Sequence, residues 1–127
     1  MVLDPFARMY ELQKMTQEFF RDNGAADSAA LPNNPDVVAV FKENVLLMIK
    51  EVAEVLDEVD FKKHRKDDNS KAINKYRIRE ELIDVMKYWF NLCILLDIKP
   101  DELFITFEYK TDKVIERYER EFLDAKV

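Results

Sequence analysis

The chain has 127 residues, one of them cysteine, and a net charge of −6. This length predicts a single domain, 1–127, with a modest core. The negative charge, with no basic stripe carrying interleaved aromatics, argues against general nucleic-acid binding. The lone Cys93 excludes an intrachain disulfide. Together with an N-terminus unlike a signal peptide, it predicts a cytoplasmic protein. One glycine, four prolines and 48% hydrophobic residues, many at helical spacing, predict an all-α fold.

The first helix is predicted from about Asp4 to Asp22. Asp4 is a good N-cap, Pro5 suits the first helical position, and Gly24 is a typical C-terminal stop. A loop follows to about Asn34, because prolines and asparagines cluster there.

The second helix is predicted from about Asp36 to Phe61, on the strength of a long apolar stripe. The polar segment 64–70 is predicted to be an exposed connection between the second and third helices. The third helix is predicted to begin between Ile73 and Tyr76.

The third helix is predicted to end near Asp97. Its stretch Leu82–Ile98 is apolar almost all round but contains ionisable residues, so we expect a buried helix and not a membrane span. A helix of this kind needs more than one covering layer, and a partner subunit would supply it. The fourth helix is predicted to open at Pro100.

Four acidic residues form two i, i+3 pairs in predicted helices: Glu51 with Glu54, and Glu81 with Asp84. This spacing puts each pair on one helix face. Like charges in apolar surroundings are unfavourable unless neutralised. If the two helices pack together, the four carboxylates form a cage for a hard divalent cation such as Mg²⁺, with Mn²⁺ as a substitute. The alternative is two ordinary solvent-facing acidic pairs.

Such a cluster suits phosphate chemistry, which needs a metal, a positioned water and cations on the leaving group. A spare carboxylate, Glu54 or Glu51, could orient or deprotonate the water.

The candidates for contact with phosphates are the basic cluster 62–66, which includes Lys62 and Lys66, and two residues of the last helix. These two, Lys110 and Arg117, lie two helical turns apart. A solvated basic surface is the alternative. His64, inside the cluster, is expected to be a surface residue.

Asn91 lies seven residues past Asp84, on the same helix face. A buried asparagine must find hydrogen-bond partners. Both a structural role and contact with a nucleoside therefore stay open. Tyr88 and Trp89 could line a base, although core packing is favoured.

These motifs resemble the all-α nucleoside triphosphate pyrophosphatases, a superfamily that includes MazG proteins, dimeric dUTPases and phage dCTPases. The resemblance covers about Phe41 to Arg117. It consists of the two acidic pairs, the basic segment from Phe61 to Lys66, and the run Glu80–Asn91, in which the acids lead into aromatics and an asparagine.

The resemblance implies a MazG-like bundle of four to five helices, completed as a homodimer or homotetramer. It implies that the four acids bind Mg²⁺ and that a nucleoside triphosphate is cut between the α- and β-phosphates. Lys62, Lys66, Lys110 and Arg117 would contact the phosphates, and Asn91 the nucleoside.

Three positions depart from the pattern of the dUTPase and dCTPase branch. Val114 stands where an asparagine is usual, Lys87 where histidine is common, and His64 where tryptophan occurs. The departures concern the substrate more than the metal. The sequence therefore predicts a Mg²⁺-dependent pyrophosphohydrolase acting on dUTP or dCTP. A broad MazG-like house-cleaning activity, or a non-enzymatic helical dimerisation module, is the alternative.

Overall fold

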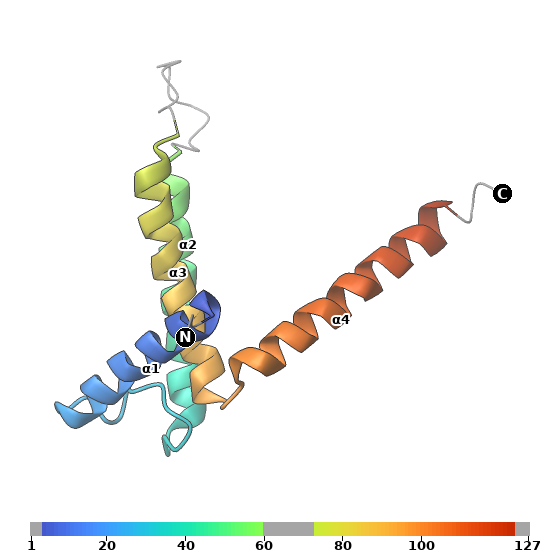
Figure 1. Cartoon of the computed structure of the whole chain (residues 1–127). Helices are drawn as coiled ribbons and strands as arrows, with labels where there is room; N and C mark the ends of the chain where they lie inside the picture. The colour runs from blue at the N-terminus through green and yellow to red at the C-terminus, as the bar shows by residue number, and fades with distance from the viewer. Residues whose placement is uncertain (1–3, 60–72, 124–127) are drawn as a thin grey trace. The chain divides into compact units, whose positions relative to one another are not determined.

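The computed structural model describes residues 4–59 and 73–123. Within these ranges the chain forms four α-helices, a short π-helical turn and no strand, so the predicted all-α class is confirmed (Figure 1). The elements are α1 (Pro5–Asp22), α2 (Val37–Asp57), α3 (Lys75–Leu95), α4 (Pro100–Tyr118) and the turn Glu119–Leu123. They fall into two compact units, one ending at Asp97 and the other beginning at Ile98.

The ends of α1 follow the predicted capping residues. The Asp4 carboxylate accepts a hydrogen bond from the Phe6 backbone N–H at 3.0 Å, and Pro5 occupies the first turn. At the other end Asn23 is the C-cap, and Gly24 takes a φ of 97°, which glycine adopts without steric cost.

In the first unit α2 and α3 pack side by side, and α1 packs on α3 (Figure 1). Ala30 of the loop before α2 packs with Val40 of α2 and Leu95 of α3, and all three residues are fully buried. A second cluster forms where α1 meets α3, with the Phe90 ring 5.5 Å from Phe6 and 5.3 Å from Trp89, centroid to centroid. Trp89 packs against Phe90 while about a third of its side chain stays exposed.

The second helix is shorter than predicted. It ends at Asp57, with Glu58 and Val59 in a turn, whereas the sequence predicted an end near Phe61, which lies outside the described residues. The last turn of α2 has no basic residue and carries acids, which are unfavourable at a helix C-terminus.

Part of the apolar stripe of α2 stays exposed within the described part of the chain. Ile49, Val52 and Leu56 are each about half exposed. An exposed apolar face of this kind is compatible with cover by a second subunit, and the homo-oligomer therefore stays a prediction.

The second unit consists of α4 and the turn that follows it. Pro100 begins the helix as predicted, and the Glu102 carboxylate accepts a hydrogen bond from the Lys99 backbone N–H at 3.4 Å. None of the residues of α4 is buried. No helix in the described ranges is long and apolar enough to cross a membrane.

Candidate metal centre

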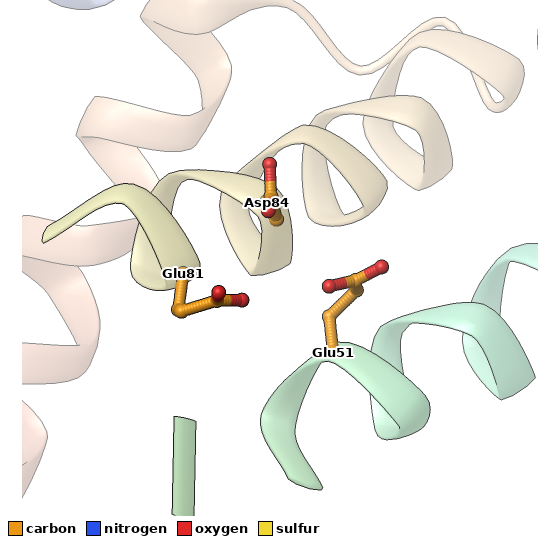
Figure 2. Close-up of side chains that lie close together, drawn as sticks. All are labelled: Glu51, Glu81 and Asp84. Atoms are coloured by element: carbon orange, nitrogen blue, oxygen red, sulfur yellow. The ribbon is translucent and has the colours of Figure 1, made fainter. Parts of the chain in front are cut away.

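Three of the four predicted carboxylates meet between α2 and α3. Oxygen atoms of Glu51, Glu81 and Asp84 lie within 4.8 Å of one another. Glu51 projects from α2 toward Glu81 and Asp84, which project from neighbouring turns of α3 (Figure 2). The i, i+3 spacing therefore puts both acids of α3 on the face that meets α2.

The two glutamates lie deeper than the aspartate. Glu51 and Glu81 are partly buried, and Asp84 is exposed. The Oε2 atoms of Glu51 and Glu81 are buried and have no hydrogen-bond partner among the described residues. A buried carboxylate oxygen without a partner is costly, which makes these two atoms unusual in a folded protein.

The proton affinity of these two glutamates reflects their surroundings. Burial raises the pKa of Glu51 above its ordinary value of 4.5, and the neighbouring Glu54, Asp84 and Glu81 raise it further. Burial also raises the pKa of Glu81, with Glu54 and Asp84 next in importance. Each carboxylate is thus destabilised in its charged form unless a cation or a proton neutralises it.

The fourth predicted acid, Glu54, stands beside this group of three. It lies near enough to Glu51 and Glu81 to raise the pKa of both, but it is not one of the residues whose oxygens mutually approach within 4.8 Å. Glu54 could complete the coordination of a cation or hold a water next to it.

Tyr88 borders the same cluster one turn further along α3. Burial raises the pKa of its phenol, and the nearby Glu51 and Asp84 raise it further. The sequence suggested core packing, or a wall for a base, as the role of this residue. Its position four residues after Asp84 was the signal that it would lie next to the acids.

Asn91 is buried, as expected for an asparagine in apolar surroundings, and the structure supplies its partners. Its Oδ1 accepts a hydrogen bond from Gln13 at 2.8 Å, and its Nδ2 donates one to Asn44 at 2.9 Å. The structural role is therefore observed, while contact with a nucleoside stays a prediction.

The sequence did not single out Gln13 and Asn44. A signal existed for Asn44, which lies seven residues before Glu51, as Asn91 lies seven residues after Asp84. Both asparagines therefore share helix faces with the acids. For Gln13 the signal was weaker, namely a polar residue at helical spacing from Tyr10 and Gln17 on the buried face of α1.

The predicted phosphate contacts belong either to the segment outside the described residues or to the second unit. Lys62, His64 and Lys66 lie outside the described residues. Lys110, Val114 and Arg117 are exposed on α4, in the second unit. Lys87 lies on α3 in the wall of a cavity of about 150 Å³ between α1 and α3.

No curated protein and no solved structure matches this chain. Comparison with protein families does give a match. A family model described as dUTPase matches residues 5–125, nearly the whole length, including both acidic pairs. In general terms, this match supports a function in the hydrolysis of nucleoside triphosphates. The chain belongs to this dUTPase family.

Proposed function

We propose that the protein is a Mg²⁺-dependent pyrophosphohydrolase that converts a deoxynucleoside triphosphate, dUTP or dCTP, to the monophosphate and pyrophosphate. The observation that carries the proposal is the meeting of Glu51, Glu81 and Asp84 within 4.8 Å, in a chain that belongs to the dUTPase family. An ordinary acidic surface would not hold two buried carboxylate oxygens without hydrogen-bond partners.

The donor set fits a hard divalent cation. Mg²⁺ takes oxygen ligands and is commonly held by a few carboxylates together with substrate phosphates, and Mn²⁺ accepts similar donors. Glu51, Glu81 and Asp84 would hold the cation, with Glu54 as a fourth ligand. When bound, the cation would polarise a phosphoryl oxygen and neutralise the charge that develops during phosphoryl transfer.

The residues themselves would place and activate the water. Glu54, beside the group of three, is our proposed base, and Glu51 is the second candidate. A carboxylate at hydrogen-bond distance from the attacking water can both orient it and accept its proton. Attack on the α-phosphorus would then release pyrophosphate.

The remaining contacts come from the family resemblance. Lys62, Lys66, Lys110 and Arg117 are proposed to neutralise the triphosphate, because cationic side chains stabilise the charge on the phosphate oxygens. Asn91 is proposed to contribute to nucleoside binding. We further propose that the protein acts as a homodimer or homotetramer, which would cover the exposed apolar residues of α2.

A pyrophosphate-release assay over all common dNTPs and NTPs with Mg²⁺ tests the proposal. We expect release from dUTP or dCTP by the wild-type protein and its loss in Glu54→Gln, with circular dichroism showing that the helices are retained. The matched control is Asp57→Asn, one turn along α2 on an exposed residue, which should keep activity.

Release from many nucleotides would replace the pyrimidine substrate by a broad house-cleaning activity. If a folded wild-type protein released no pyrophosphate from any nucleotide, the enzyme proposal would be withdrawn in favour of a helical dimerisation module.

A further inference from the structure

Three buried carboxamides form a continuous chain of hydrogen bonds through the first unit. Gln13 donates to Asn91 at 2.8 Å, Asn91 donates to Asn44 at 2.9 Å, and Asn44 donates to the backbone carbonyl of Val40 at 2.8 Å. The three side chains are only 8%, 5% and 5% exposed, in that order along the chain of bonds. At this burial an unmade hydrogen bond costs about 1–3 kcal/mol, so each carboxamide is held in one orientation.

The direction of this chain of bonds is fixed from its Val40 end. A backbone carbonyl can only accept, so Asn44 must turn its nitrogen toward Val40 and its oxygen toward Asn91. Asn91 must then use its nitrogen for Asn44, which leaves its oxygen to accept from Gln13. The donors and acceptors cannot be reversed without placing two oxygens against each other.

The other end of the chain of bonds opens on the cavity of about 150 Å³ between α1 and α3. Gln13 forms part of the wall, where the other polar residues are Thr16 and Lys87 and the rest are apolar. The Gln13 nitrogen donates one N–H to Asn91, and no hydrogen bond to its Oε1 is found within the described part of the chain. Gln13 therefore has its Oε1 acceptor to offer a ligand in this cavity.

We propose that Asn44 is a positioning residue that acts through Asn91 to hold the Gln13 oxygen available to the α1–α3 cavity. That oxygen would then accept a hydrogen bond from a donor group of the ligand. This inference rests on the proposed function, because the ligand is then the nucleoside part of the substrate. Asn44 lies seven residues from Glu51, and Asn91 seven from Asp84, which is about 10 Å along each helix from the carboxylates. The nucleoside of a substrate whose phosphates sit at the carboxylates would extend over such a distance.

Two substitutions at one position separate positioning from packing. Asn44→Leu keeps the size of the side chain but removes the oxygen that fixes Asn91. Asn44→Thr has a hydroxyl that can donate to the Val40 carbonyl and accept from Asn91, so the direction of the whole chain of bonds is kept. The control for loss of stability alone is Ile94→Val, a conservative change at a fully buried residue of α3 that makes no contact in the chain of bonds.

The first readout is steady-state kinetics with the best nucleotide substrate. We expect Asn44→Leu to raise KM about tenfold, as for one lost hydrogen bond, with kcat changed less than about twofold. Asn44→Thr and Ile94→Val should stay within about twofold of the wild-type KM. Equal KM values for Asn44→Leu and Ile94→Val would overturn the proposal, because Asn44 would then act only through stability.

The second readout does not need activity. In NMR spectra the side-chain NH₂ protons of Gln13 and Asn91 should exchange slowly with solvent in the wild type, Asn44→Thr and Ile94→Val, and rapidly in Asn44→Leu. Rapid exchange in the wild type, or slow exchange in Asn44→Leu, would overturn the positioning role. If no nucleotide is hydrolysed by any variant, the proposed function fails while this exchange experiment still decides the role of Asn44.

Discussion

Glu51 on α2 and Glu81 on α3 face the same point between the two helices, and each has a buried Oε2 atom without a hydrogen-bond partner among the described residues. Both side chains have a raised pKa, for which burial is the first cause and neighbouring carboxylates the second. This pair supports the proposed cation site, because like charges in buried surroundings are unfavourable unless they are neutralised.

Removing one of these charges should stabilise the metal-free protein. We expect Glu81→Gln to raise the melting temperature in EDTA at pH 7, because a neutral side chain does not repel Glu51 and Asp84. The adjacent Glu80→Gln is the matched control, since Glu80 is exposed and is not a member of the cluster. Differential scanning calorimetry of the three proteins measures the effect. A lower melting temperature for Glu81→Gln than for Glu80→Gln would show that the cluster is not repulsive.

The same two variants should differ in their response to Mg²⁺. A ligand that binds only the folded state at 100 times its Kd stabilises by about 2.7 kcal/mol, which raises the melting temperature by several degrees. We expect this shift in the wild type and in Glu80→Gln, and its loss in Glu81→Gln. Mg²⁺ titrations followed by thermal melting provide the test, with K⁺ at equal ionic strength as the salt control. An equal shift in all three proteins would place the cation elsewhere.

Stability of the metal-free protein should also depend on pH in a defined direction. The pKa values of Glu51 and Glu81 are raised in the folded state, so folded protein binds protons that unfolded protein releases above about 4.5. The resulting stabilisation is fully present below pH 4.5 and is lost as the pH rises through the raised pKa values. We therefore expect these two residues to make the protein in EDTA more stable at pH 5.5 than at pH 7.5.

The Glu81→Gln variant isolates this contribution. The gain in melting temperature between pH 7.5 and pH 5.5 should be smaller in the variant than in the wild type, because one of the two titrating groups is gone. With saturating Mg²⁺ the trend should weaken or reverse, since protons and the cation compete for the same oxygens. A wild-type gain no larger than that of the variant would contradict the assigned pKa direction.

Asp97 offers a test of backbone strain away from the candidate site. It follows the C-cap of α3 with a φ of 54°, a region that asparagine tolerates well, and its negative charge is unfavourable at a helix C-terminus. Asp97→Asn should increase the free energy of unfolding by about 0.5 kcal/mol. Asp97→Ala, which also removes the charge but lacks the short polar side chain, should be less stable than Asp97→Asn by about 1 kcal/mol. Urea denaturation measures both, and the reverse order would refute the strain argument.

The features that could be predicted from sequence are those set by nearby residues. Asp4 and Pro5 mark the start of α1, Pro100 marks the start of α4, and an i, i+3 spacing is enough to put Glu81 and Asp84 on one face. Each of these results depends on a few consecutive residues whose helical geometry is fixed.

The features that could not be predicted depend on contacts between distant parts of the chain. The hydrogen bond from Gln13 to Asn91 joins residues 78 positions apart, and nothing local to either residue specifies the other. The end of α2 at Asp57 was also missed, because the apolar stripe continues to Val59 while the acids near the C-terminus oppose the helix dipole. The roles of Lys62 and Lys66 stay predictions, since both lie outside the described residues.

In the proposed function, the carboxylates between α2 and α3 support Mg²⁺-dependent release of pyrophosphate from a nucleoside triphosphate. The decisive experiment is phosphorus NMR of the products formed from dUTP, and separately from dCTP, with and without Mg²⁺ and with Asp84→Asn alongside. We expect monophosphate and pyrophosphate only with Mg²⁺ and only with the wild-type carboxylates. Formation of a diphosphate and inorganic phosphate, or equal turnover by Asp84→Asn, would refute this proposal.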